Sequence, residues 1–163
     1  MSKKKTVLDV LMHMSKHYNN NDVWFNINRS RKLIHELKNK GFDLKLINQS
    51  FDWLISLMRT KITLEKLPSD RSALRIFSKE EKIYFNLSGI NFILFLQAHE
   101  ILDTLTRELV IQQTLLLQLE SITIPIIKGV VALVLFVNEL DTSDKLKKLN
   151  FLLLQEDTPG EYH

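Results

Sequence analysis

Residues 26–77 decide the fold of this chain, beginning with NINRSRKLIHELKNKG at positions 26–41 and continuing through FD to LKLINQSFDWLISLM at positions 44–58. Both runs carry apolar residues at helical spacing. Gly41 stands where a left-handed residue commonly ends a helix, and Asp43 is a preferred cap for the helix that follows. This stretch therefore predicts two helices hinged at a glycine.

Two shorter segments follow these helices and alternate apolar with polar residues. Lys61–Glu65 and Ser72–Phe77 are predicted to be strands joined by a turn at Pro68–Asp70. A further helix is predicted at Val7–Tyr18, and three helices with a β-hairpin make the skeleton of a winged helix. We therefore expect a winged-helix-like unit over residues 6–77.

The remainder of the chain predicts helices alone. Ser78 followed by Glu81 is a capping box, Asp103 is an N-cap, and Pro125 suits the first turn of a helix. The predicted helices cover residues 79–102 with a break near 88–89, then 104–119, 125–138 and 144–155. The expected fold is thus mainly α, with the winged-helix-like unit packed on a helical bundle (78–155) and a flexible tail at 156–163.

The composition is that of an ordinary globular protein, because 45% of the 163 residues are apolar and 25% are charged. Cysteine is absent, which excludes disulfides and thiolate chemistry and fits a reducing cytoplasm. The N-terminal segment carries Asp9, His13 and Lys16 where a secretory signal would be uninterrupted and apolar. The apolar stretch Ile122–Val137 contains Lys128 and is shorter than the ~20 residues of a membrane span. We expect a cytoplasmic protein that makes no membrane contact.

Charge is unevenly distributed along the chain. Residues 1–75 hold 15 Lys and Arg against 7 Asp and Glu, whereas residues 76–163 hold 7 against 12. A basic half beside an acidic half can indicate a nucleic-acid-binding face, and it can equally indicate two halves that attract each other. The many Lys, Ile and Asn residues equally suit an AT-rich genome, so these three interpretations stay open.

Six short motifs occur along the chain in a fixed order. They are Leu8–Met12, Gly41–Asp43, Phe51–Leu54, Leu74–Glu81, Phe92–Leu96 and Thr106–Ile111. In this order and spacing the chain resembles the bacterial Smg proteins, and the resemblance runs over nearly its whole length. It implies a small cytoplasmic bacterial protein of undetermined function, whose gene commonly lies near those for the DNA-processing protein Smf and DNA topoisomerase I.

The chain departs from the Smg pattern at two points. Smg proteins typically carry Leu-Lys-Trp-Val before the apolar helix, whereas this chain has Ile127-Lys-Gly-Val130, so any role of that tryptophan is lost. Many relatives are strongly acidic, whereas this chain carries a net charge of +3. The second departure argues against a DNA-binding face shared by the whole family.

The predicted helix 44–58 has one narrow polar stripe that could face a partner. Asn and Gln side chains read bases, and Lys and Arg side chains contact phosphates. The candidate face for nucleic acid or a protein partner comprises Lys45, Asn48, Gln49 and Arg59, with Arg71 and Arg75 on the predicted wing. Asp52 lies in the middle of this stripe and argues against DNA, so packing or protein contact remains the alternative.

Histidines and carboxylates do not form a pattern typical of catalysis or metal binding. His13 and His17 share a helical face, but no third ligand has matching spacing. In the pairs His35–Glu36 and His99–Glu100 the neighbouring side chains point about 100° apart on a helix. We therefore expect no catalytic residues, no metal and no cofactor.

Arg107 and Glu108 lie in the first turn of a predicted helix. A positive charge there opposes the helix dipole, so a carboxylate should offset it. We expect a structural ion pair between Arg107 and Glu81, with Glu80 as a second candidate carboxylate. A ligand-binding Arg107 is the alternative.

These observations together predict a non-enzymatic adaptor or regulator that binds another cytoplasmic protein. The alternative is a winged-helix nucleic-acid-binding protein linked to DNA processing or topology. The chain shows no glycine-rich phosphate-binding loop and no nucleophile–base pair, so the sequence does not support an enzyme.

Overall fold

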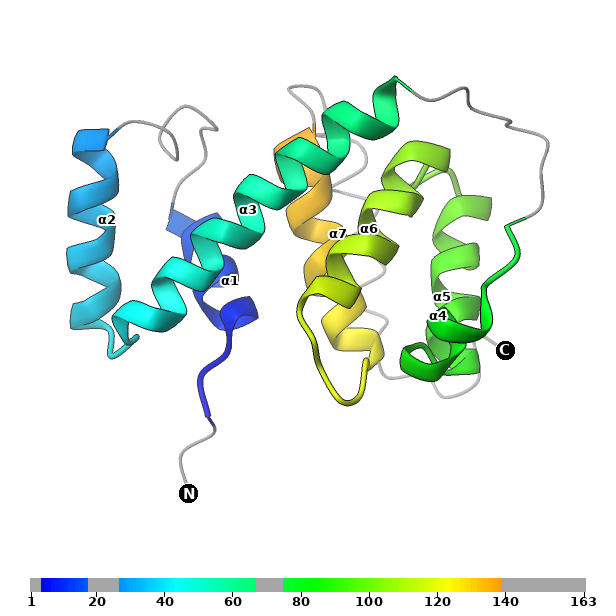
Figure 1. Ribbon diagram of the computed structural model, residues 1–163, viewed down its shortest axis with the longest axis horizontal. Helices are drawn as coiled ribbons and strands as arrows, with labels where there is room; N and C mark the ends of the chain where they lie inside the picture. Colours follow the sequence, from blue (N-terminus) through cyan, green and yellow to red (C-terminus); the bar gives the residue numbers. More distant parts are fainter. Residues whose placement is uncertain (1–3, 18–26, 67–74, 139–163) are drawn as a thin grey trace. The chain divides into compact units, whose positions relative to one another are not determined.

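The computed structural model describes residues 4–17, 27–66 and 75–138, and over these residues the chain is mainly α, as predicted (Figure 1). The helices in the described part are α1 (Val7–His17), α2 (Ile27–Asn39), α3 (Leu44–Glu65), α4 (Lys79–Tyr84), α5 (Leu87–Ala98), α6 (Thr104–Leu116) and α7 (Ile124–Asn138). Close contacts divide the chain into two compact units, residues 1–56 and 57–163. Each unit is described by itself.

The first unit contains α1, α2 and the first part of α3. Thr6 and Asp9 close the start of α1 reciprocally, because the Thr6 amide donates to the Asp9 carboxylate at 2.8 Å and the Asp9 amide donates to the Thr6 hydroxyl at 3.3 Å. Its buried apolar residues are Val10, Leu11, Met14, Leu33, Leu37, Ile47, Trp53 and Leu54. Burial of this set stabilises α1 and α2, which are short enough to be marginal alone, against the first part of α3.

The predicted glycine hinge is confirmed. Gly41 has φ +92°, and the Phe42 amide donates to the Leu37 carbonyl at 3.1 Å, which closes α2 as in a Schellman motif. Asp43 then caps α3, because its carboxylate accepts from the Leu46 amide at 2.8 Å. The turn between α2 and α3 is therefore determined by residues within it.

The prediction of a strand at Lys61–Glu65 is wrong, because α3 continues through these residues to Glu65. Extending a formed helix adds one hydrogen bond for each residue that becomes ordered, and no proline occurs before Pro68. Lys61 and Glu65 form an i,i+4 ion pair at 3.8 Å that fits this helix. The predicted first strand of the wing is the last turn of a long helix.

The second predicted strand is not seen either. Residues 75–77 have no regular structure, and residues 67–74, which include the predicted turn and Arg71, lie outside the described part. In the part of the chain that the structure describes, the only β interaction is an isolated parallel bridge between Phe85 and Ile122. The winged-helix hairpin is thus absent from the described residues.

The second unit contains a helical bundle in which α5, α6 and α7 pack on one another (Figure 1). Helix α7 is apolar almost all round, and its buried residues include Ile127, Val130, Val131, Leu133, Val134 and Leu135, as expected for a core helix. No helix among the described residues is both long and apolar enough to span a bilayer.

Local signals set the helix starts of the bundle. The capping box of Ser78 and Glu81 is confirmed, and Asp103 caps α6 as predicted. The break between α4 and α5 falls at Phe85 and Asn86 instead of at 88–89, because the Asn86 side chain accepts from the Gly89 amide at 2.8 Å and starts a new helix. The predicted helix 144–155 and tail 156–163 lie outside the described residues.

Candidate functional site

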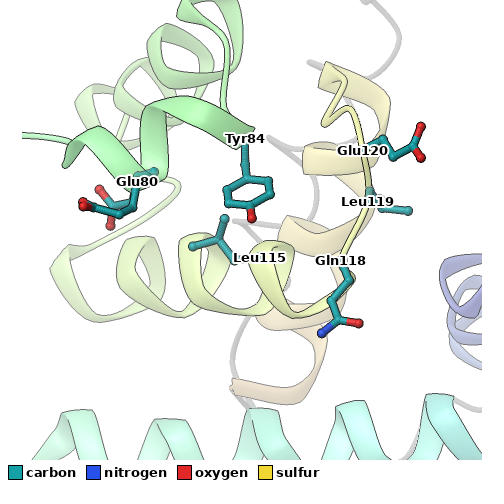
Figure 2. Close-up of a pocket in the computed structure, with 7 residues that line it drawn as sticks. Glu80, Tyr84, Leu115, Gln118, Leu119 and Glu120 are labelled. Carbon is teal, nitrogen blue, oxygen red and sulfur yellow. The ribbon is translucent and has the colours of Figure 1, made fainter.

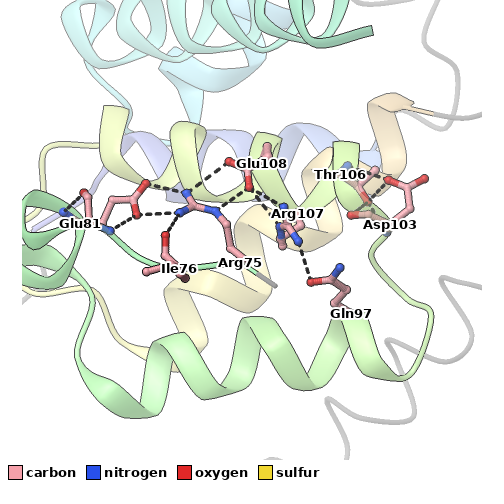
Figure 3. A network of polar contacts seen from close by, with 9 residues as sticks. Arg75, Ile76, Glu81, Gln97, Asp103, Thr106, Arg107 and Glu108 are labelled. Carbon is pink, nitrogen blue, oxygen red and sulfur yellow. Dashed lines mark hydrogen bonds and ion pairs between the residues drawn. The ribbon is translucent and has the colours of Figure 1, made fainter. Parts of the chain in front are cut away.

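Arg75 is the centre of a partly buried ionic network in the second unit (Figure 3). Its guanidinium donates to Glu81 at 2.7 and 3.1 Å and to Glu108 at 2.7 and 3.3 Å. It also donates to the Ile76 carbonyl at 2.6 Å and lies 4.9 Å from the centre of the Phe77 ring. One guanidinium thus ties the segment before α4 to both α4 and α6.

Arg107 lies at the other end of the same network. Its guanidinium donates to Glu108 at 2.9 and 3.1 Å and to the Gln97 side-chain oxygen on α5 at 3.0 Å. Figure 3 shows the resulting order Glu81, Arg75, Glu108, Arg107 and Gln97. The two residues of the predicted ion pair, Arg107 and Glu81, are therefore linked through Arg75 and Glu108.

The network shifts the pKa values of Arg75 and Glu81. Burial by itself lowers the pKa of Arg75, but its hydrogen bonds to Glu81 and Glu108 and their negative charges outweigh burial and raise the pKa. Burial by itself raises the pKa of Glu81, but hydrogen bonds from Arg75 and the Ser78 amide, with the Arg75 charge, lower it below its ordinary value of 4.5. Both groups are held in their charged forms.

A groove of about 490 Å³ opens beside this network, between α4, the end of α6 and the turn that leads to α7 (Figure 2). Its lining comprises Glu80, Glu81, Tyr84, Leu115, Gln118, Leu119 and Glu120. In Figure 2 the Tyr84 ring lies between Glu80 on one side and Glu120 on the other. The groove therefore combines apolar walls with acidic edges.

Large apolar side chains are exposed along the segment that carries α4. The exposed fractions are 77% for Ile76, 75% for Ile83, 48% for Tyr84 and 70% for Leu87. Phe77 and Phe85 in the same segment are buried, and their rings pack edge to face with centroids 6.1 Å apart. Two phenylalanines thus anchor this segment to the bundle while its other large apolar residues face outward.

The residues of the predicted partner face have different environments. Lys45, Asn48, Gln49 and Arg59 are all exposed on this helix, and so is Asp52 among them. Arg75 is instead engaged by two carboxylates, and Arg71 lies outside the described residues. Four of the six predicted residues are therefore exposed on one helix, spread along it from Lys45 to Arg59.

The apolar residues of α3 are only partly covered. Ile47 and Leu54 are buried, whereas Ile55 is 43% exposed and Leu44 is 46% exposed. The apolar arc of α3 is thus broader than the surface that its neighbours cover.

No group of three His, Asp, Glu or Cys side chains suited to a metal occurs within the described ranges. His13 lies beside the Phe42 ring with centroids 6.1 Å apart, and His99 packs on Phe95 with centroids 4.2 Å apart. The rings of these two histidines therefore contribute to packing within the protein.

Sequence reasoning missed the groove and the central role of Arg75. Tyr84, Leu115 and Leu119 lie in apolar runs, and the sequence does not distinguish them from core residues. The sequence carried no clear signal for the groove, since the end of α4 at Tyr84 was predicted to lie further along the chain. No local signal marked Arg75 as a link between helices, because Glu108, one of its two carboxylate partners, is 33 residues away.

Comparison with known proteins gives one consistent family. A family model described as "Protein of unknown function (DUF494)" matches residues 7–162. The chain is 32% identical over 161 residues to the "Protein Smg homolog" of Coxiella burnetii (strain Dugway 5J108-111), covering 99% of each chain. It is 33% identical over 133 residues to the Smg homolog of Nitrosococcus oceani, covering 81% of this chain and 83% of the relative. No solved structure matches the chain.

Proposed function

The chain belongs to the Smg homolog family, a family of unknown function, and we propose its role from its exposed side chains. It acts as a non-enzymatic adaptor that binds another protein through α4. The observation that carries this proposal is the exposure of Ile76, Ile83, Tyr84 and Leu87 within one short segment. Single exposed apolar residues are common on protein surfaces, whereas four large ones within residues 76–87 favour an interaction site.

The rigidity of this segment supports the proposal. Arg75 holds the Ile76 carbonyl at 2.6 Å, and the capping box of Ser78 and Glu81 closes the start of α4 at 2.9 and 3.1 Å. A surface that is already ordered loses little conformational entropy when a partner binds, so less of the binding energy is used to order it. The exposed side chains of α4 are therefore presented on a fixed backbone.

Site-specific photo-crosslinking in cells tests the adaptor role. A photoreactive residue is placed at Ile83 in the full chain, and a matched one at Lys38, which is exposed on α2. We expect a discrete protein adduct from position 83 that survives nuclease treatment and is missing from position 38. Equal adducts at both positions, or none at position 83, would refute a docking surface at α4.

A second candidate function is nucleic-acid binding by the polar face of α3. The exposure of Lys45, Asn48, Gln49 and Arg59 on this helix favours it, whereas exposed Asp52 and the engagement of Arg75 argue against it. Displaced counterions make such binding strongly salt-dependent, and loss of one phosphate contact lowers the salt slope by about one. Duplex DNA titrated against the full chain and Lys45→Ala decides this candidate, and a lack of binding at low salt would eliminate it.

A further inference from the structure

We propose that the groove beside α4 binds a basic amphipathic segment of the partner, in which large apolar residues are flanked by Lys or Arg. This inference rests on the proposed adaptor role and adds where the partner docks and what chemistry it carries.

The apolar part of the proposed ligand follows from the groove walls. Tyr84, Leu115 and Leu119 line a space of about 490 Å³, which is within the range of ligand-binding pockets (Figure 2). Tyr84 is 48% exposed, so a ligand side chain can reach its ring without displacing any core residue. Aromatic residues at such positions commonly contribute most to the binding energy of protein interfaces.

The basic part follows from the acidic edges. Among the described residues, neither Glu80 nor Glu120 forms an ion pair, and both are exposed. Glu81 also lines the groove, but its negative charge is already matched by Arg75 at 2.7 Å. Two carboxylates therefore remain on opposite sides of an apolar groove, and they favour cationic groups and repel acidic ones.

The groove has a well-defined wall at the end of α6. Gln118 has φ +52°, and its amide donates to the Leu115 carbonyl at 3.1 Å, so the chain turns sharply there. The left-handed conformation is unfavourable for a residue with a side chain. After this turn the chain continues through Leu119 and Glu120, so that an apolar and an acidic residue lie together at the groove.

Fluorescence anisotropy with the full chain and three labelled peptides of about 15 residues, enough for four helical turns, tests this proposal. The first peptide is amphipathic and built from Lys and Leu, the second has the same composition in scrambled order, and the third has Glu in place of Lys. We expect the first peptide to bind at least tenfold more tightly than the other two. Equal binding of the first two would show general electrostatic attraction and overturn the proposal.

Paired variants locate the binding at the groove. Glu80→Lys and Glu120→Lys should each weaken binding about tenfold, because each removes an attraction and adds a repulsion. Asp52→Lys makes the same change in charge on α3 and should leave the affinity unchanged. Tyr84→Ala should also weaken binding about tenfold, whereas Leu116→Ala should not, although the two residues are similarly exposed at 48% and 50%.

Two outcomes would assign the groove to a different occupant. The chain itself contains a basic apolar stretch, Lys145–Leu154. A labelled peptide of residues 144–155 that binds as tightly as the amphipathic peptide, and loses binding with Glu80→Lys, would assign the groove to this segment. A dimer in sedimentation experiments that Glu80→Lys dissociates would assign it to a second copy. Either result overturns the proposal.

The failure of this inference is distinguishable from the failure of the adaptor role. If no peptide binds but position 83 still gives its specific crosslink, the adaptor role stands and the proposed chemistry of the partner is wrong. If the crosslink is missing as well, both are wrong.

Discussion

Replacing Arg75 with methionine should destabilise the second unit by about 2–3 kcal/mol, a value between the ~3–5 kcal/mol for breaking a buried pair and the ~0–1 kcal/mol of an exposed one. The intermediate value follows from burial, because the side chains of Arg75, Glu81 and Glu108 are 17%, 17% and 23% exposed. Each carboxylate also keeps another partner, the Ser78 amide for Glu81 and Arg107 for Glu108. Methionine keeps an apolar stem of similar length, so the change removes the guanidinium together with its hydrogen bonds and its 4.9 Å contact with the Phe77 ring.

Urea unfolding followed by far-UV circular dichroism measures this loss as a lower midpoint at an unchanged slope. Lys79→Met is the matched control, because it removes an exposed cation from α4 and should change stability by less than about 0.5 kcal/mol. Arg75→Lys keeps the charge but loses the planar fork that reaches two carboxylates, so it should give roughly half of the methionine effect. If Arg75→Met and Lys79→Met have the same midpoint, the network is not a stabilising element and our reasoning fails.

Three further predictions follow from contacts within each unit. Since the pKa of Glu81 is lowered in the folded state, its contribution to stability should be complete above its ordinary pKa of 4.5 and should decrease as pH falls below that value. A thermal unfolding series in which Glu81→Gln loses no pH dependence relative to the wild type would contradict this. Gly41→Ala should lower the free energy of unfolding by about 1–2 kcal/mol, because φ at this position is +92°, and Gly41→Asn should lower it less. Chemical unfolding measures both variants. An alanine variant as stable as the wild type would show that this backbone conformation is not strained for a residue with a side chain. Asp103→Ala should lower stability by about 1 kcal/mol through loss of the cap on α6, whereas Asp103→Asn should lower it by a few tenths of a kcal/mol. Equal losses of stability in calorimetry would show that the capping hydrogen bond is not the cause.

Much of the helical organisation could be predicted because helix starts depend on nearby residues. Asp43, Ser78 and Asp103 each accept from an amide three residues further along the chain, and those bonds form in the predicted places. The end of α3 could not be predicted in this way. Lys61–Glu65 alternates like a strand, and only the cooperativity of the preceding helix decides its conformation.

The candidate site could be predicted only in part, for a related reason. The sequence predicted an ion pair between Arg107 and Glu81, whereas Glu81 pairs with Arg75 and Arg107 pairs with Glu108, and it placed Arg75 on a wing. The position of Arg75 depends on Glu108, and residues 33 apart in the sequence meet only after α4 and α6 have packed. The groove could not be predicted for the same reason, since Tyr84 and Leu115, which line it, belong to different helices.

The amino-acid sequence by itself determined that this chain is helical, where most of its helices begin, and which family it belongs to. These properties depend on hydrogen bonds across three or four residues and on the order of short motifs. Only the tertiary structure decided that Arg75 binds two carboxylates and that Ile83 and Tyr84 face outward while Phe77 and Phe85 are buried. A side chain becomes buried or exposed through the neighbours that packing brings to it, and residues distant in the sequence supply those neighbours.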